Sequence, residues 1–150
     1  MRRARPADVH TLTQIAFRSK QSNGYDDKFM QACKMELAVT ESDLESSEFW
    51  VAERDALCGF VCLRLIEGSA AGEVASFFID PDHQQQGIGS LLWQALLQRA
   101  RQLELTNLQL ASDPAATGFY ENLGFRVSGQ VPSGSIAGRT LPQMTLDLSQ

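Results

Sequence analysis

Hydrophobic and polar residues follow one another along this chain at two spacings, which predict helices and strands. Apolar residues three and four positions apart favour amphipathic helices. The expected helices follow the N-caps Asp8 and Asp26, run from 87 to about 103, and run from 113 to 124. Shorter apolar runs bounded by turn residues predict strands. Their expected ranges are 2–5, 48–53, 57–66, 73–79, 107–111, 126–130 and 140–148.

The helix expected after residue 113 has the clearest boundary signals in the chain. Asp113 suits an N-cap and Pro114 suits the first helical position. Gly124 suits the left-handed residue that ends a helix, and Phe125 is then expected to fold back on the turn that carries Tyr120.

The order of these elements predicts an α/β (α+β) fold with one mixed central sheet and helices on both of its faces. The sheet would have about seven strands. A length of 150 residues suits a single domain, 1–150, with one substantial core. We see no internal repeat and no linker long enough to divide the chain.

Composition and charge exclude several classes of protein. The net charge is −5, and no basic cluster follows Arg2, Arg3 and Arg5, which argues against nucleic acid as a partner. No segment approaches the ~20 apolar residues of a membrane span, and no apolar segment follows the basic start as in a signal peptide.

The cysteines indicate a reduced, cytoplasmic protein. Cys33, Cys58 and Cys62 are odd in number and lie at no metal-ligand spacing, so we expect buried thiols and no metal. A catalytic cysteine would need help from one of only two histidines, His10 and His83, and is disfavoured.

The segment Gln84–Gly89 carries the most informative candidate chemistry. It lies between an expected strand and a strongly amphipathic helix, and the first N–H groups of a helix lack partners within it. The helix dipole adds partial positive charge at the same end. Gly87 would let an anion approach the backbone, and Gly89 would let the helix lie close to its neighbours. This order predicts a phosphate site.

Two familiar phosphate loops do not fit this segment. The dinucleotide fingerprint needs a small residue where Leu92 stands, and the P-loop needs a lysine that is missing here. An ordinary turn that happens to contain two glycines is the alternative interpretation.

The remaining pattern, Gln-x-x-Gly-x-Gly, resembles the acyl-CoA-binding signature of the GNAT N-acetyltransferase superfamily. Residues 113–125, which contain Phe-Tyr-x-x-x-Gly-Phe, resemble that superfamily's second signature at the expected distance downstream. The resemblance is detailed from Glu73 to Phe125, and the order of elements extends it over the chain. Many relatives carry Asn where Ala115 stands, which implies weaker contacts with coenzyme A here.

The resemblance implies a GNAT-like acyl-CoA N-acyltransferase fold with a mostly antiparallel sheet. It also implies an N-acetyltransferase that moves an acetyl group from acetyl-CoA to a primary amine of a small molecule or protein. The amine would attack the thioester directly. A non-catalytic acyl-CoA-binding or regulatory module is the alternative. The acceptor, the acyl length and the oligomeric state stay open, although homodimers are common in the superfamily.

The same resemblance assigns the residues that bind the cofactor. Backbone N–H groups of the glycine loop would hold the pyrophosphate of coenzyme A. A backbone N–H at Phe78 or Ile79 would polarise the thioester carbonyl. The full expected set is Phe78, Ile79, Gln84, Gln85, Gln86, Gly87, Ile88, Gly89, Ser90, Asp113, Ala115, Phe119 and Tyr120.

Two residues are candidates for proton transfer. Tyr120 matches the superfamily's general acid, which would protonate the leaving thiolate; a core aromatic with a bonded hydroxyl is the alternative. Glu73 is a candidate general base for the amine, directly or through water; a solvent-facing carboxylate at a strand end is its alternative.

Two loops are expected to border the acceptor, because the resembled fold places them opposite the coenzyme. They are 19–25, which would break the first helical pattern, and 132–139. Tyr25, Ser133 and Arg139 are the candidate acceptor-binding residues, and Arg139 could pair with an acceptor carboxylate in a forked geometry. Two ordinary surface loops are the alternative.

Overall fold

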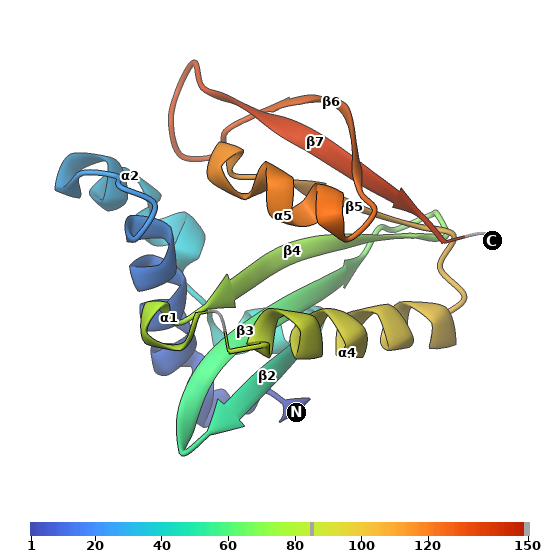
Figure 1. The fold of residues 1–150 in the computed structure, drawn as a ribbon, viewed down its shortest axis with the longest axis horizontal. Helices are drawn as coiled ribbons and strands as arrows, with labels where there is room; N and C mark the ends of the chain where they lie inside the picture. Colours follow the sequence, from blue (N-terminus) through green and yellow to red (C-terminus); the bar gives the residue numbers. More distant parts are fainter. Residues whose placement is uncertain (85, 149–150) are drawn as a thin grey trace.

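The computed structural model of the chain describes residues 1–84 and 86–148 (Figure 1). Its helices are α1 Val9–Gln21, α2 Asp27–Leu37, α3 Glu41–Ser46, α4 Ile88–Gln102 and α5 Thr117–Asn122. Its strands are β1 Arg2–Arg3, β2 Glu48–Arg54, β3 Ala56–Leu65, β4 Ala71–Ile79, β5 Asn107–Ala111, β6 Arg126–Pro132 and β7 Thr140–Asp147. Three short 3₁₀ turns cover Pro6–Asp8, Pro81–His83 and Pro114–Ala116.

The strands form one seven-stranded sheet in the order β1-β2-β3-β4-β5-β7-β6. Neighbouring strands are antiparallel except for β4 and β5, which are parallel. The predicted mixed, mostly antiparallel sheet with helices on both faces is therefore confirmed.

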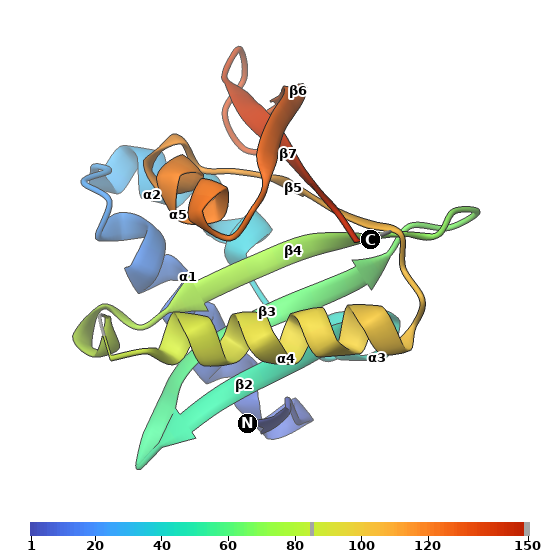
Figure 2. The same ribbon diagram turned by 45° about the vertical axis from the view of Figure 1, so that its right-hand side comes forward.

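Helices pack against the sheet from both sides. Helix α4 crosses in front of β2 and β3, whereas α1 lies behind the strands (Figure 2). Leu92 and Leu96 of α4 are fully buried in a cluster with Val61 of β3. On the other face, Leu12 of α1 belongs to a second cluster with Phe60. The apolar stripes predicted from sequence thus face the sheet.

The sheet separates into two halves along β4. β4 and β5 pair only from Ala71 with Asn107 to Glu73 with Gln109, after which the strands diverge (Figure 2). The register with β3 also shifts within β4, where Ala75 is left without an opposite residue. Such a bulge bends a strand and increases its twist. The second half of β4 therefore borders a gap inside the sheet.

Three local predictions are wrong in detail. Asp8 does not cap α1 with its side chain; its carboxylate accepts the Arg5 N–H at 2.8 Å and pairs with Arg2 at 2.8 Å. Helix α1 continues to Gln21, so the predicted break at Ser19 comes three residues too early. The helix expected from 113 begins as a 3₁₀ turn before α5.

We expect Leu96→Ala to lower the free energy of unfolding by about 2–5 kcal/mol, because it opens a cavity beneath α4. Leu91→Ala is the matched control in the same helix, since Leu91 is 46% exposed; its effect should stay below about 1 kcal/mol. Urea unfolding followed by circular dichroism measures both. Equal losses in the two variants would contradict the packing of α4 described above.

Candidate active site

The N-terminus of α4 has the geometry of an anion site. The Leu91 N–H donates to the Gly87 carbonyl at 3.2 Å, so the N–H groups of Ile88, Gly89 and Ser90 precede the first intrahelical bond. No side chain of the described residues caps this end. Helices α2 and α3, in contrast, are capped by side-chain oxygens. Three N–H donors are therefore available to a ligand.

The two glycines of this segment have different roles. Gly87 has φ +79°, a left-handed conformation that favours glycine, and a Cβ there would meet open space. A Cβ on Gly89 would lie 3.1 Å from Ile79 Cδ1 and 3.6 Å from Phe119 Cε1. Gly87 thus leaves the donors accessible, while Gly89 allows α4 to lie close to β4 and α5.

The turn before these glycines is tied to α1. The buried Asp80 carboxylate accepts the Asp82 N–H at 2.9 Å and pairs with Arg18 at 2.7 Å. The Nδ1 of His83 is 3.8 Å from Asp80 and has no hydrogen-bond partner among residues 1–84 and 86–148. Gln84 and Gln86 are exposed. The prediction for Gln85 lies outside the described residues.

The edge of β4 offers backbone groups to the gap. The Asp80 N–H donates to the Cys58 carbonyl of β3 at 2.8 Å. Because the direction of hydrogen bonding alternates along an antiparallel strand, Phe78 also points its N–H toward β3. Phe77 and Ile79 then point theirs into the gap. Of the two predicted positions, Ile79 fits the role of donor and Phe78 does not, whereas Phe77 was missed.

Tyr120 lies among aromatic rings beside this edge. Its ring centroid is 5.2 Å from that of Phe119, 5.7 Å from that of Phe125 and 6.2 Å from that of Phe77. No group in the described part of the chain hydrogen-bonds its hydroxyl. Burial, with a smaller contribution from the charge of Asp113, raises the pKa of Tyr120 well above its ordinary value. The phenol is therefore neutral and holds its proton at physiological pH.

Glu73 stands where β4 and β5 are still paired. Its carboxylate is 3.1 Å from the Arg64 guanidinium and is 38% exposed. It borders a hollow of about 300 Å³ on the sheet, whose lining residues are Ile66, Glu73, Gln109, Leu110, Ala111, Val131 and Gln143. β4 begins at Ala71, two residues before the predicted start, so Glu73 is the third residue of the strand and not its first.

Asp113 contacts its own turn and a segment that is distant in the sequence. It accepts the Ala115 N–H at 2.9 Å, which confirms the predicted cap. It also accepts the Tyr25 hydroxyl at 2.8 Å and pairs with Lys20 at 3.2 Å. Burial alone would raise the pKa of the Asp113 carboxyl, but these hydrogen bonds and the Lys20 charge hold that pKa below its ordinary value.

The structure brings two of the three predicted acceptor residues together. Arg139 donates to the Tyr25 hydroxyl at 2.8 Å. The Ser133 hydroxyl instead accepts the N–H groups of Ser135 and Ile136 within its own loop. Sequence reasoning missed Lys20, because it was placed in a loop and no local signal pairs it with a residue far along the chain.

Within 1–84 and 86–148, no three His, Cys, Asp or Glu side chains are grouped so that they could hold a metal ion. None of the helices in the same ranges has the length and apolar character that a membrane crossing needs.

Comparison with known proteins decides the family. Residues 9–125 match the model of the acetyltransferase (GNAT) family. The chain belongs to that family. It is also 33% identical to the peptidyl-lysine N-acetyltransferase YjaB of Salmonella typhimurium, over 97% of this chain and 95% of the relative. The predicted GNAT resemblance and N-acetyltransferase activity are therefore confirmed.

Solved GNAT structures share the fold. The PaiA N-acetyltransferase of Thermoplasma acidophilum, in complex with coenzyme A, superposes with a TM-score of 0.80 at 19% identity, covering 97% of this chain and 96% of its own. The structure of yncA from Salmonella typhimurium, with its cofactor acetyl-CoA, gives 0.69 at 23% identity, covering 99% and 93%. These likenesses show that the chain has the same overall fold as solved GNAT acetyltransferases.

We expect Gly87→Asp to remove the stabilisation of this GNAT protein by acetyl-CoA. A ligand present at about 100 times its dissociation constant adds about 2.7 kcal/mol to the unfolding free energy. The variant places a carboxylate beside the free N–H groups of α4. Thermal unfolding with and without acetyl-CoA measures the change.

Gly68→Asp is the matched control for this experiment. Gly68 has the same φ of +79° and equally open space, but it lies in the β3–β4 turn. Both variants should lose similar stability without ligand, and only Gly68→Asp should keep the acetyl-CoA shift. An intact shift in Gly87→Asp would contradict the anion site.

Proposed function

We propose that this GNAT enzyme acetylates lysine side chains of proteins or peptides, using the uncapped N-terminus of α4 and the open edge of β4 to hold acetyl-CoA. The relative YjaB, named a peptidyl-lysine N-acetyltransferase, supports the acceptor. The observation that carries the proposal is the meeting of three features. Within residues 1–84 and 86–148, they are the uncapped N–H groups of Gly89 and Ser90, the N–H groups of Phe77 and Ile79 on the edge of β4 that β5 has left, and the Tyr120 phenol, which makes no hydrogen bond there.

Each feature matches one part of the coenzyme. The α4 N–H groups and the helix dipole suit the pyrophosphate. The β4 edge suits the amide-bearing pantetheine arm, which can pair with a strand edge as an added strand does. Ala115 is exposed and offers no side-chain amide, so this set of contacts is mostly made by the backbone. The residues present therefore fit acetyl-CoA.

The thioester of acetyl-CoA supplies an activated carbonyl for attack by the amine. Phe77 and Ile79 direct N–H groups to the place where oxyanion charge would develop, and fixed donors there lower the barrier. Tyr120 donates its proton to the leaving thiolate. The thiol, with a pKa near ~8.5, then retains this proton at neutral pH, and the strongly basic tyrosinate takes a proton from water to restore the phenol.

Glu73 accepts the proton that the attacking amine loses. The four residues from Glu73 to Phe77 span about 13 Å along the strand. A carboxylate at that distance cannot reach the amine directly, so we assign a water relay to the hollow beside Glu73.

Lysine peptides and small amines, incubated separately with acetyl-CoA, test the proposed acceptor. We expect acetylation of capped lysine peptides, detected as free thiol release and as added mass on the peptide. Thiol release with small amines alone would overturn the lysine proposal. Release with neither class would favour the non-catalytic acyl-CoA-binding alternative.

We expect Tyr120→Phe to lower kcat by about 10²-fold, because general-acid catalysis typically contributes about 10²–10⁴. The ring packing is retained, so the KM for acetyl-CoA should change by less than about twofold. Steady-state kinetics measure both, and pre-steady-state thiol release shows whether chemistry limits the rate. If chemistry limits the rate and turnover is unchanged in the variant, Tyr120 has a purely structural role.

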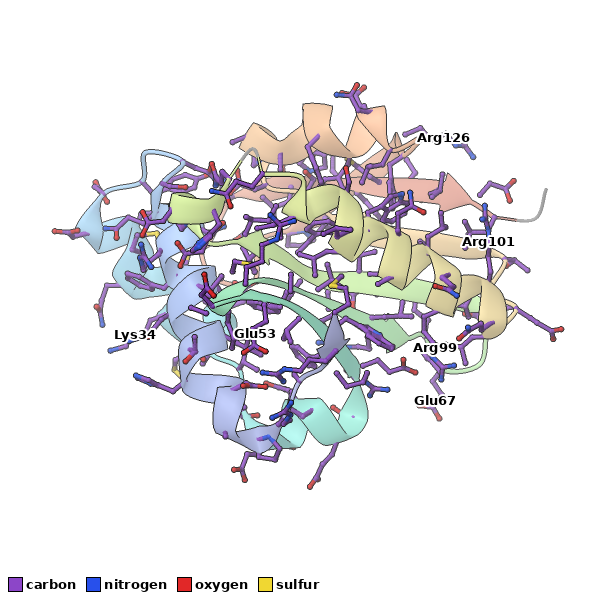
Figure 3. The ribbon with its side chains drawn as sticks, turned by 60° about the horizontal axis from the view of Figure 1, so that its bottom comes forward. Lys34, Glu53, Glu67, Arg99, Arg101 and Arg126 are labelled. Atoms are coloured by element: carbon purple, nitrogen blue, oxygen red, sulfur yellow. The ribbon has the colours of Figure 1, made fainter. Side chains whose placement is uncertain are left out.

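We expect Glu73→Gln to lower kcat/KM for the lysine peptide by about 10²-fold at neutral pH. The loss should shrink as pH rises toward the amine pKa of ~10.4, since more acceptor is then already deprotonated. Glu67→Gln is the control, because Glu67 is a nearby carboxylate that points into solvent (Figure 3). A loss that does not depend on pH would argue against general-base catalysis.

A further inference from the structure

Five side chains from three segments meet where α1 and α2 approach the β6–β7 loop. We call this group the Asp113 cluster; its members are Lys20, Tyr25, Phe29, Asp113 and Arg139. Tyr25 and Phe29 stack with ring centroids 4.0 Å apart. The Arg139 guanidinium lies 4.9 Å from the Phe29 ring centroid, and its Nη2 is 4.0 Å from the Asp113 carboxylate.

The Asp113 cluster contains more positive charge than its own carboxylate balances. Lys20 and Arg139 are both cationic, and Asp113 is the anion that they share. All three side chains are largely shielded, with exposed fractions of 16%, 19% and 15%. One positive charge is therefore left over in a partly desolvated place, although the whole protein carries a charge of −5.

Hydrogen-bond donors are also in excess in the Asp113 cluster. The Arg139 guanidinium has five N–H donors, and its only hydrogen bond to the described residues goes to the Tyr25 hydroxyl. Lys20 has three donors and makes one bond there, to Asp113. Shielded cationic donors need further acceptors, because an unsatisfied polar group out of water is costly.

The Asp113 cluster stands near the reacting centre. Asp113 follows the end of β5, where that strand has left β4, and its ion pair with Lys20 ties this place to α1. Figure 1 shows α1 and α2 on the side of the molecule where β4 ends. It caps the turn that leads into α5, the helix that carries Tyr120. An acceptor amine beside Tyr120 would therefore have the rest of its molecule close to Lys20 and Arg139.

We propose that Lys20 and Arg139 bind a carboxylate of the acceptor, so that the enzyme prefers lysines with an aspartate or glutamate close by in the peptide. This inference rests on the proposed function. The Tyr25–Phe29 stack holds the guanidinium plane, and a planar fork matches a carboxylate in a way that an ammonium does not. A phosphate of the coenzyme is the other anion that could occupy the cluster, and the experiment separates the two.

The test uses short capped peptides with one central lysine. Each peptide carries aspartate, asparagine or lysine at one neighbouring position, and the position is varied from peptide to peptide. At the best position, kcat/KM should be about tenfold or more higher for aspartate than for asparagine, as expected of a charged hydrogen bond. Arg139→Gln should abolish the preference for aspartate, whereas Arg139→Lys should retain part of it. The higher kcat/KM of the aspartate peptide should come from a lower KM for the peptide, with kcat unchanged.

Two control variants remove a positive charge elsewhere. Arg126 of β6 and Lys34 of α2 both point outward from the molecule (Figure 3). Arg126→Gln and Lys34→Gln should keep the aspartate preference. If either control loses it, the preference reflects overall charge, and the assignment to Lys20 and Arg139 is wrong.

Binding of the same peptides to the coenzyme A-loaded enzyme provides a readout that does not need turnover. Tighter binding of the aspartate peptide that is lost in Arg139→Gln supports the proposal, even if lysine acetylation itself is not seen. Equal binding of aspartate and asparagine peptides overturns it and leaves the lysine proposal standing. Equal weakening of coenzyme A and peptide binding in Arg139→Gln would assign the cluster to the coenzyme and also overturn it.

Discussion

β4 and β5 pair over only three residues each, Ala71–Glu73 with Asn107–Gln109. Both halves of the proposed site depend on this early end of the pairing. An unpaired strand edge normally attracts another strand, so proteins usually cover or charge it. Here the edge lies inside the sheet, where a partner protein's strand has little access but an extended amide-bearing ligand can enter. The short pairing thus leaves open the strand edge to which we assign the coenzyme.

Packing keeps the gap open from both sides. Helix α4 fixes the β2–β4 half through Leu92 and Leu96, and Gly89 brings its first turn against Ile79. Phe125 packs against both Tyr120 and Trp93, which links α5 to the same core. The two halves therefore share one apolar core on this face even though their backbones diverge. A rigid gap is the condition for donors that are already oriented when the coenzyme arrives.

The parts that could be predicted from sequence are those that depend on local signals. Gly87, Gly124 and the Asp113 cap each require a particular backbone conformation, so their positions were correct. The end of α1 was placed too early because Ser19 and Gln21 are polar, yet the helix continues to present Lys20 to Asp113. Contacts between residues so far apart in sequence leave no local pattern.

Strand register explains the remaining error. A resemblance can identify the right strand, but only the pairing with β3 shows which N–H groups face the gap, and a one-residue shift reverses them all. The bulge at Ala75 is what makes counting along β4 unreliable from sequence. Phe78 was therefore assigned to an edge that its neighbours Phe77 and Ile79 occupy.

The two halves of the proposed site differ in the groups that they offer to a ligand, and this difference bears on specificity. The proposed coenzyme half consists of backbone N–H groups, whose positions do not depend on the neighbouring side chains as long as Gly87 and Gly89 are kept. The proposed acceptor half consists of side chains such as Lys20, Tyr25 and Arg139, which a helix and loops carry. Substitutions there alter the charge offered to an acceptor without moving the β4 edge. One fold can therefore keep its acyl donor while its acceptor changes.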